Sequence, residues 1–540
     1  PDPFAVPNMR EAAARIGAAL RDGETIAVYG DYDADGVTST AILLLALEQA
    51  SGRRPRAWLP DREAGYGLHA EAVREIAASD ATLLIAVDCG SGDDAEVALA
   101  RSLGLDVVVI DHHQMHGPPP DGAIVVSPRA RPGAPYGELS AAGLAYLFAV
   151  ALTRLGFDLG RGVEREPIRL LDLAAIGLVG DSSPMIGATR TMVRNGMICL
   201  RGSRRPGIKA LFQPAKIDPQ RLRSADIAMR LAPRINAPGR MAKPDLALEL
   251  LLAPDDAAAR RLMQEVEAHN QGRRGETDAM FAAAVDRIEA EALADGRRVL
   301  VVTGDAWRHG VVGLVAGRLA RHYDRPVLLL AAAGDELRGS ARSVDGFDIT
   351  AALHDAGRLL RRCGGHHQAA GLELAAADLG ALTERLEAAV RAAGLGAPQP
   401  NAIRIAADLP VERFDLPTAR LVESLEPFGA GFPEPTLRLR RARVRFADRI
   451  GADRRHLRIK IATPGGLADV LCWGGGDRAA EALGAGWIDV VGRIAVNEWG
   501  GRRSVQLVAE DFRPSGAAAA NGGALADRDA AGAASIKGVS

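Results

Sequence analysis

Short apolar runs alternate with longer amphipathic stretches through the first quarter of the chain. Four runs rich in Val, Ile and Leu have the length of buried strands, and they cover residues 25–29, 82–87, 106–110 and 123–126. The stretch 37–50, between the first two runs, has the length and composition of a helix. This alternation predicts a parallel sheet with helices on both faces, and therefore an α/β domain.

The pattern changes character further along the chain. Residues 254–296 are rich in Ala, Glu and Arg with apolar residues on one side only, which predicts one long helix bridging two domains. A helical hairpin broken near Gln271 and Gly272 remains the alternative. The strand and helix pattern then returns and predicts a second α/β domain, in which one helix ends near Cys363. A region of short strands and turns follows. The predicted segments are 1–253, 254–296, 297–396, 397–514 and an Ala- and Gly-rich tail, 515–540, expected to be disordered.

Composition adds little to this picture. A chain of 540 residues is too long for one core, and 48% hydrophobic and 25% charged residues are typical of globular proteins. No apolar run is long enough to span a membrane and no signal peptide is recognisable, so we expect a cytoplasmic protein without a membrane partner. The four cysteines form no CxxC pair, which argues against a disulfide framework or a zinc ribbon.

Three acidic side chains follow the first predicted strand. Asp31, Asp33 and Asp35 alternate along the chain, and residues 23–52 contain no Lys or Arg that could neutralise them. The carboxyl end of a parallel strand is the usual ligand position in an open α/β sheet. Carboxylates this close repel one another unless a proton or a cation lies between them. Taken alone, the motif is equally compatible with a solvated acidic turn that caps a helix.

Further acids and an imidazole follow the later elements. Asp88 closes the second strand, Asp111, His112 and His113 close the third, and Asp181 closes a helix-like stretch. Each has an ordinary structural explanation as a turn residue, a buried imidazole or a helix cap. Five of these residues, taken together, suit two divalent cations that share a ligand. Their mixed oxygen and nitrogen donors favour Mn²⁺, or Mg²⁺, over zinc. The set comprises Asp33, Asp35, Asp88, His112 and Asp181. Such a centre catalyses phosphoryl transfer, which indicates a phosphoesterase.

Several motifs resemble one family. The DYDADG segment at 31–36, the Asp88 strand end, the DHH segment at 111–113 and Asp181 resemble the four motifs of the DHH phosphoesterases. Further motifs narrow the resemblance to the RecJ-like exonucleases over about residues 3–512. These are PDREAGYGL (60–68), PRINAPGRM (233–241), RGSARS (338–343), GGHHQAAG (364–371) and LEPFGAGFPEP (425–435).

This resemblance implies a fold and an activity. The fold is α/β, with a parallel-sheet DHH domain, a long connecting helix, a second α/β DHH-associated domain and a C-terminal OB-like β barrel. The activity is a 5′→3′ exonuclease that releases 5′-mononucleotides from single-stranded DNA in repair and recombination, with a single-strand-binding protein and a helicase as possible partners. A DHH enzyme for nanoRNA or cyclic dinucleotides, and a non-catalytic DNA-binding scaffold, are the alternatives.

The resemblance also implies residue roles. Asp88 would bridge two divalent cations, Asp33 would complete one site, and Asp35, His112 and Asp181 would complete the other. His113 would contact the scissile phosphate, and Asp31 and Asp111 join it as catalytic residues. Substrate contacts are expected from Asn236, Arg240, Ser340, Arg342 and His366, with Ser340 and Arg342 alternating on one face of an extended segment.

Arginines dominate one strand-like stretch near the C-terminus. In TLRLRRARVRF the apolar and basic positions slip by one residue, and a β-bulge at Arg440 and Arg441 would bring all five arginines to one side. Such a basic face fits an OB-fold that follows a nucleic-acid backbone, with Arg441, Arg443 and Arg445 as DNA contacts. A solvated edge strand that uses Arg against aggregation is the alternative.

Overall fold

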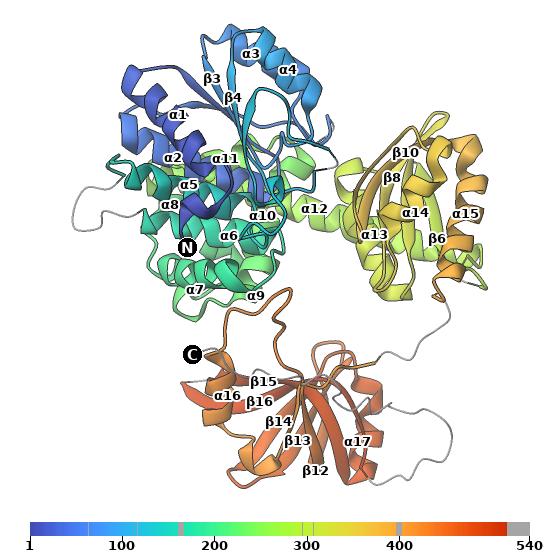
Figure 1. Ribbon diagram of the computed structural model, residues 1–540. Coiled ribbons are helices and arrows are strands. Elements are labelled where there is room, and N and C mark those ends of the chain that lie inside the picture. The colour runs from blue at the N-terminus through green and yellow to red at the C-terminus, as the bar shows by residue number, and fades with distance from the viewer. Residues whose placement is uncertain are drawn as a thin grey trace. The chain divides into compact units, whose positions relative to one another are not determined.

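The structure is a computed structural model that describes residues 1–62, 64–115, 117–159, 167–293, 295–305, 307–395, 402–499 and 501–515. The chain forms two compact units (Figure 1). The first contains Pro1–Gln399 together with Pro427–Phe432, and the second contains Pro400–Glu426 and the rest of the chain from Pro433. The predicted tail lies outside the described residues, apart from Ser515.

The first unit begins with a five-stranded sheet whose strands are all parallel, in the order β2-β1-β3-β4-β5. The strands are β1 (Ile26–Tyr29), β2 (Arg56–Trp58), β3 (Leu83–Val87), β4 (Asp106–Ile110) and β5 (Ala123–Val126). Four of them confirm the predicted strands. The edge strand β2 was not predicted, because three residues with only two apolar side chains give no periodic signal.

Helices cover both faces of this sheet (Figure 1). Alternate residues of β3 point to opposite sides, so that Leu83 and Ile85 join one core and Leu84 joins the other. Helices α3 and α4 pack on the Leu84 side, and α1, α2 and α5 pack on the opposite side. The helices before the long connection are α1 (Met9–Asp22), α2 (Ala34–Ser51), α3 (Ala70–Ala78), α4 (Asp94–Ser102), α5 (Ala141–Arg154), α6 (Leu171–Gly180), α7 (Gly187–Arg201), α8 (Pro206–Ala215), α9 (Ser224–Asp226), the π-helix η5 (Ile227–Leu231), α10 (Ala232–Met241) and α11 (Asp245–Leu251).

The long connection is one unbroken helix, α12 (Asp256–Ala290), which excludes the alternative hairpin. The side chain of Asp255 caps it by accepting hydrogen bonds from the amides of Ala257 and Ala258. Val266 joins the core beneath the first sheet, and Ile288 joins the core of the following domain. The helix therefore shares its narrow apolar side between two cores, as its composition predicted.

The second α/β domain contains a mixed sheet in the order β6-β7-β8-β10-β9. Its strands are β6 (Leu300–Asp305), β7 (Val327–Ala333), β8 (Glu336–Arg342), β9 (Arg362–His366) and β10 (Ala369–Ala375), and its helices are α13 (His309–Tyr323), α14 (Ile349–Ala356) and α15 (Leu379–Ala392). One prediction here was wrong. The helix expected to end near Cys363 ends at Ala356, and Cys363 and His366 lie on β9 because that strand pairs with β10.

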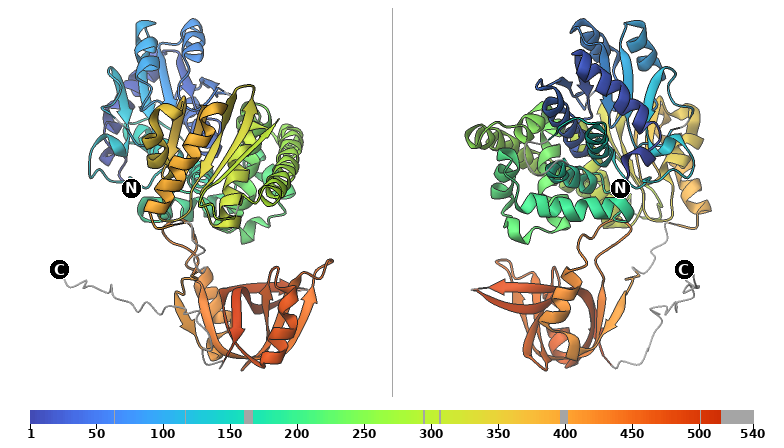
Figure 2. Two further views of the ribbon diagram at one scale, coloured as in Figure 1. Left: turned by 90° about the vertical axis from the view of Figure 1, so that its right-hand side faces the viewer. Right: turned by 60° about the vertical axis from the view of Figure 1, so that its left-hand side comes forward.

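The second unit is a closed barrel (Figure 2). Pairing of β12 with β15 closes the order β12-β13-β14-β16-β15 into a ring of strands. Strand β11 pairs in parallel with the first residues of β12. The elements are β11 (Ala407–Leu409), α16 (Leu416–Glu423), β12 (Leu437–Ile450), β13 (His456–Thr463), β14 (Gly466–Cys472), α17 (Ala479–Ala485), β15 (Trp487–Trp499) and β16 (Arg502–Pro514). The predicted bulge is confirmed, since the register shifts between Leu439 and Ala442 and Arg441 has φ of 50°.

The predicted range 397–514 is not one continuous domain, because residues 427–432 pack with the first unit. Within the described part of the chain, no helix combines the length and apolar character needed to cross a membrane.

Candidate metal centre and nucleic-acid interface

The acidic loop is shaped by the start of α2. Asp33 caps this helix, because its Oδ1 accepts hydrogen bonds from the amides of Asp35 (2.8 Å) and Gly36 (3.1 Å). A Cβ atom at Gly36 would lie 2.5 Å from the carbonyl oxygen of Asp31, so only glycine allows the loop to close so tightly. The loop thereby turns Asp31, Asp33 and Asp35 around the carboxyl end of β1.

Asp88 follows β3 and lies next to this loop. Its backbone has φ of 65°, a conformation that non-glycine residues rarely adopt and that is found at functional sites. Its Oδ1 lies 3.3 Å from Nε2 of His112, which follows β4. Strands β1, β3 and β4 are neighbours in the sheet, so their carboxyl ends bring these residues together as the sequence predicted.

Two groups of side chains in this region have the spacing of metal ligands. Asp31, Asp33 and Asp88 form one group, and Asp88, His112 and His113 form the other, with one ligand atom of each residue within 4.8 Å of the others. Asp88 belongs to both groups. The structure therefore places Asp88 where a shared ligand would lie, although that role stays a prediction.

The acids of the cluster lie close together, and the described residues do not satisfy all of their buried oxygens. The buried oxygens Oδ1 of Asp31 and Oδ1 of Asp88 have no hydrogen-bond partner. Burial, and then repulsion from Asp33, raises the pKa of Asp31 to about 8. Burial, and then Asp35, raises the pKa of Asp88 well above its usual range. Unpaired buried oxygens of this kind are costly without a cation, so the donor set fits hard divalent cations.

Asp35 and Asp181 lie at helix ends beside these groups. The carboxylate of Asp35 accepts hydrogen bonds from Ser140 Oγ (2.7 Å) and from the amides of Ala141 (2.8 Å) and Ala142 (3.0 Å) at the start of α5. Burial, and then repulsion from Asp35, raises the pKa of Asp181 to about 8. The carboxylates of Asp35 and Asp181 therefore repel each other. Asp35 Oδ2 also lies 3.8 Å from His112 Nε2.

His113 is held by a second layer of residues. Its Nδ1 lies 2.7 Å from Oδ1 of the fully buried Asp111, and 2.8 Å from the hydroxyl of Tyr66. Burial is the largest single effect and lowers the pKa of His113. The hydrogen bond to Asp111, together with the negative charges of Asp111, Asp181 and Asp35, outweighs burial and raises the pKa to about 9. Asp111 also accepts hydrogen bonds from the hydroxyl and amide of Ser91. Asp111 thus contacts His113 from this second layer, and its predicted catalytic role stays a prediction.

A group of arginines gathers in the same unit. Ser340 and Arg342 lie on one face of β8, with Arg342 Nη1 2.5 Å from Ser340 Oγ. Arg240, from α10, donates a hydrogen bond to the carbonyl oxygen of Gly310 at 3.0 Å. Burial, and then the charge of Arg62, lowers the pKa of Arg342 to about 10, and the same two causes lower the pKa of Arg240. Crowded, half-buried cations of this kind fit an anionic ligand.

Arg62 and Tyr66 were not among the predicted site residues. Both belong to the PDREAGYGL motif, so the signal was present, but the described residues of that segment form no strand or helix that could have placed it. An ordinary ion pair of Arg342 with the nearby Asp345 would have been the simplest use of this arginine. Among the described residues the two do not pair, and Asp345 accepts a hydrogen bond from Gln368.

Asn236 and His366 were predicted to contact substrate. Asn236 Oδ1 accepts a hydrogen bond of 2.6 Å from the amide of Ala34, so it supports the acidic loop. His366 ends β9, and burial followed by the charges of His367 and Arg342 lowers its pKa. A substrate role for either residue stays a prediction.

The basic face of the barrel differs from its prediction. The five arginines of β12 between positions 438 and 445 avoid the barrel core, as predicted. Arg438 and Arg440, however, both pair with Asp408, and Lys460 pairs with Asp469. The face is therefore not purely basic, because strands distant in sequence add acids to it. Arg441, Arg443 and Arg445 are exposed and have no ion pair with a described carboxylate, and the first two lie 5.8 Å from the ring of Trp487.

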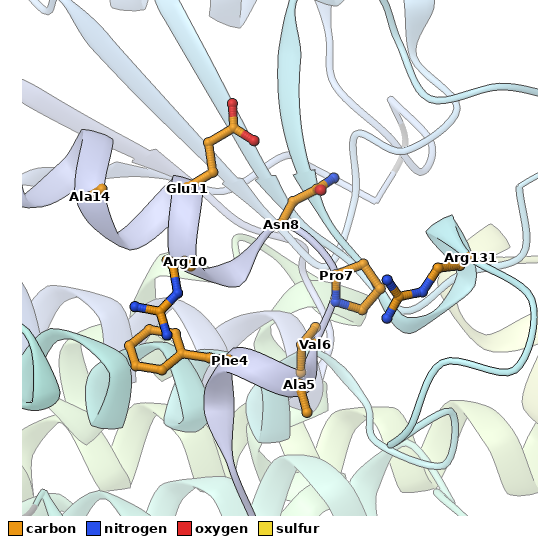
Figure 3. Close-up of a pocket in the computed structure, with 9 residues that line it drawn as sticks. All are labelled: Phe4, Ala5, Val6, Pro7, Asn8, Arg10, Glu11, Ala14 and Arg131. Atoms are coloured by element: carbon orange, nitrogen blue, oxygen red, sulfur yellow. The ribbon is translucent and has the colours of Figure 1, made fainter.

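A cavity of about 380 Å³ lies at the start of the chain, between Phe4, Arg10 and Arg131 (Figure 3). None of the predicted site residues lines it. The chemistry of the acids and arginines described above therefore has no part in this cavity.

Three family models match the chain. They are the DHH family, N-terminal domain over residues 25–178, the DHHA1 domain over residues 296–392 and the RecJ OB domain over residues 405–511. Together they cover the first sheet, the second α/β domain and the barrel.

Named relatives extend over almost the whole chain. The single-stranded-DNA-specific exonuclease RecJ of Dickeya dadantii is 34% identical over 93% of this chain and 90% of its own length. RecJ of Bacillus subtilis is 33% identical over 94% of this chain, which spans 64% of that relative's length. The crystal structure of RecJ from Thermus thermophilus in complex with Mn²⁺ matches with a TM-score of 0.80 and 33% identity, over 94% of this chain and 72% of that one. The corresponding complex with Mg²⁺ matches with a TM-score of 0.74, 31% identity and coverage of 94% and 70%. With these motifs, this order of domains and this identity over most of its length, the chain belongs to the RecJ family of DHH phosphoesterases.

Proposed function

We propose that this protein is a single-stranded-DNA-specific exonuclease that degrades strands in the 5′→3′ direction and releases 5′-mononucleotides. The observation that carries this proposal is the cluster of Asp31, Asp33 and Asp88, in which the buried Oδ1 atoms of Asp31 and Asp88 have no hydrogen-bond partner among the described residues. The same unit also contains the group of half-buried arginines around Arg342. An acidic cluster suited to cations and a basic group suited to phosphate are the two parts that phosphodiester hydrolysis from an end requires.

Divalent cations are the proposed cofactors, Mn²⁺ or Mg²⁺. Support comes from the acidic and imidazole side chains of the cluster. It also comes from the crystal structures of RecJ from Thermus thermophilus, which are complexes with Mn²⁺ and with Mg²⁺. Asp88 would serve both cations, with Asp33 on one side and Asp35, His112 and Asp181 on the other. Bound cations supply activation of water and stabilisation of the leaving oxygen.

His113 provides a proton donor beside the cluster. With a pKa of about 9, its imidazole is protonated near neutral pH and can donate a hydrogen bond to an oxygen of the scissile phosphate. Asp111 fixes the ring by its bond to Nδ1, which leaves Nε2 for the substrate. Asp31 lies next to Asp33 and would add a further carboxylate to the cluster once bound cations favour its deprotonated form.

The direction of cleavage requires recognition of one end of the strand. A terminal 5′-phosphate carries close to two negative charges near neutral pH, against one for an internal phosphodiester, so a group of arginines prefers the terminus. Arg342, Ser340 and Arg240 are the proposed ligands, with Arg62 as an addition from the structure. His366 and Asn236 would contact or support the first nucleotide.

The two alternative functions have less support. The match to the RecJ OB domain and the exposed Arg441, Arg443 and Arg445 suit a long strand better than nanoRNA or a cyclic dinucleotide. A non-catalytic scaffold has no need for the complete set of acids. Roles in repair and recombination, a cytoplasmic location, and a helicase or single-strand-binding protein as partners are proposed on the family relationship.

Incubation of the full chain with Mn²⁺ and end-labelled single strands tests this function. A 5′ label is expected to appear in mononucleotides from the first time point, while a 3′ label passes through a ladder of shortening strands. The reverse distribution, or cleavage of duplex and single strand at equal rates, would contradict the proposal.

A further inference from the structure

A six-residue segment leaves the second unit in sequence and packs in the first. Residues 427–432, PFGAGF, form a tight turn in which Gly429 and Phe432 exchange two backbone hydrogen bonds, of 3.0 and 3.1 Å. The rings of Phe428 and Phe432 stack at 5.8 Å, with 13° between their planes. Phe432 packs against the large core of the first unit. This turn is therefore a preformed body with its own internal contacts.

The turn holds the loop that follows Asp181. The amide of Met185 donates a hydrogen bond of 2.6 Å to the carbonyl oxygen of Ala430. A Cβ atom at Gly429 would lie 3.1 Å from Cε of Met185, so the two segments are in close contact. Within this loop, Ser182 has φ of 61°, and Ser183 donates a hydrogen bond of 3.1 Å to Oδ2 of Asp181. A loop with a strained residue keeps one shape only when its surroundings hold it.

The same turn holds a second segment of the first unit. Ser224 Oγ donates a hydrogen bond of 2.8 Å to the carbonyl oxygen of Phe428, and the amide of Phe428 lies 3.1 Å from the same Oγ. Ser224 begins the helical stretch that continues through the π-helix η5 into α10. That stretch delivers Asn236, whose side chain bonds to the amide of Ala34 in the acidic loop.

Arg190, on α7, also contacts the turn. Its Nη1 donates a hydrogen bond of 2.5 Å to the carbonyl oxygen of Pro427, and its guanidinium lies 4.1 Å from the centre of the Phe432 ring. The turn thus contacts the loop after Asp181, the start of the stretch that leads to Asn236, and α7.

We propose that residues 427–432 are a positioning clamp for the metal centre. By holding Met185 and Ser224, the clamp fixes the Asp181 loop and the support of the acidic loop at once. None of its residues is proposed to touch cation or substrate. The proposal rests on the proposed function only in taking Asp181 as a ligand of a divalent cation. Ordinary core packing, in contrast, would stabilise the fold without affecting cation binding.

Two substitutions in the full chain remove contacts between the clamp and the rest of the first unit. Ser224→Ala removes both bonds to Phe428, and Arg190→Met removes the bond to Pro427 and the cation over Phe432. Arg194→Met, at an exposed position one turn later on α7, is the matched control. Two quantities are measured without DNA. One is the rate of hydrogen exchange at the Met185 amide, and the other is Mn²⁺ binding, for which the electron paramagnetic resonance signal reports the free ion.

We expect each clamp variant to exchange the Met185 amide about three- to tenfold faster and to weaken the more weakly held Mn²⁺ by a similar factor, the size expected for one or two lost hydrogen bonds. The exonuclease rate should then fall at limiting Mn²⁺ and recover at saturating Mn²⁺. Arg194→Met should match the unsubstituted protein in all three measurements. If Arg190→Met unfolds, Arg190→Lys, which keeps a cation and a donor, should show the same effects at smaller size.

Faster exchange at Met185 with an unchanged Mn²⁺ isotherm would overturn the clamp and leave only packing. That outcome does not depend on nuclease activity, because Mn²⁺ binding is measured without substrate. Loss of Mn²⁺ affinity in a protein that cuts no DNA would support the clamp and contradict the proposed function instead.

Discussion

The two charged regions of this molecule are organised in opposite ways. In the first unit, Asp31, Asp35 and Asp88 are buried, and two of their oxygens have no hydrogen-bond partner among the described residues. In the second unit, Arg438, Arg440 and Lys460 lie on the barrel surface and pair with nearby carboxylates. Buried charge without a partner is expensive, whereas exposed ion pairs contribute about 0–1 kcal/mol each. Buried charged groups that lack partners, and therefore cost stability, identify a functional site better than a high density of charged residues does.

The largest effect should come from the centre of the buried acids. Asp88→Ala removes the residue common to both ligand groups and should lower the exonuclease rate at least about a hundredfold, the upper range for disturbing a metal site from its surroundings. Without metal, the variant should be more stable, because a repelling buried carboxylate is gone. Rates from labelled strands and thermal melts in chelator measure the two effects. Asp94→Ala, at an exposed acid at the start of α4, is the control, and near-normal turnover of Asp88→Ala would contradict the assignment.

The two regions also differ in how far the sequence predicted them. The acids were predictable because consecutive parallel strands end at one edge of a sheet, so Asp33, Asp88 and His112 meet whatever the details of the loops. The partners of the barrel arginines were not, because Asp408 and Asp469 lie on other strands and only the strand pairing brings them near.

Other parts of the site needed the folded chain. Tyr66 and Ser91 contact His113 and Asp111 from loops that carry no periodic pattern. The end of α14 was misplaced because Cys363 takes part in a strand pair that a helical pattern in one sequence does not reveal. The separation of residues 427–432 from the barrel likewise follows from contacts with Ser224 and Arg190, which are remote in sequence.

The next largest effect concerns the half-buried arginines. Arg342→Ala should reduce the preference for 5′-phosphorylated over 5′-hydroxyl strands by about ten- to a hundredfold, the range for losing a hydrogen bond to a charged group. Initial rates on the two strands give the ratio. Arg338→Ala on the same strand is the control, since that guanidinium pairs with Glu373 at 2.8 Å. Equal loss on both strands would make Arg342 a general backbone contact.

A smaller effect is expected from pH on the metal-free protein. The pKa values of Asp31 and Asp181 are raised from 3.8 to about 8, and that of His113 from 6.5 to about 9. Between pH 6.5 and 8 the folded state therefore binds more protons than the unfolded state, so stability must fall as pH rises, by about 1 kcal/mol per pH unit for each group. The lowered pKa of His112, about 4, acts in the opposite direction, mainly below pH 6.5 and with a contribution that fades above it.

Melting temperatures in chelator and in Mn²⁺ measure this dependence. In chelator they should drop from pH 6.5 to pH 8, and in Mn²⁺ the drop should shrink or reverse, because cations bind the deprotonated acids more tightly. A profile in chelator that rises over this interval would show that the cluster is balanced by groups other than cations.

The smallest effect tests the barrel face itself. Deletion of residues 401–540 would also remove 427–432 from the first unit, so single substitutions separate the two contributions. Arg443 has no ion pair with a described carboxylate, whereas Arg438 pairs with Asp408 at 2.6 Å. A phosphate contact releases about one counterion, so Arg443→Ala should reduce the slope of log affinity against log salt by about 1 for a long single strand. Arg438→Ala should change it less, because Asp408 already competes for that guanidinium. Equal changes in both slopes would mean that DNA displaces Asp408, and the distinction between paired and unpaired arginines on this face would then fail.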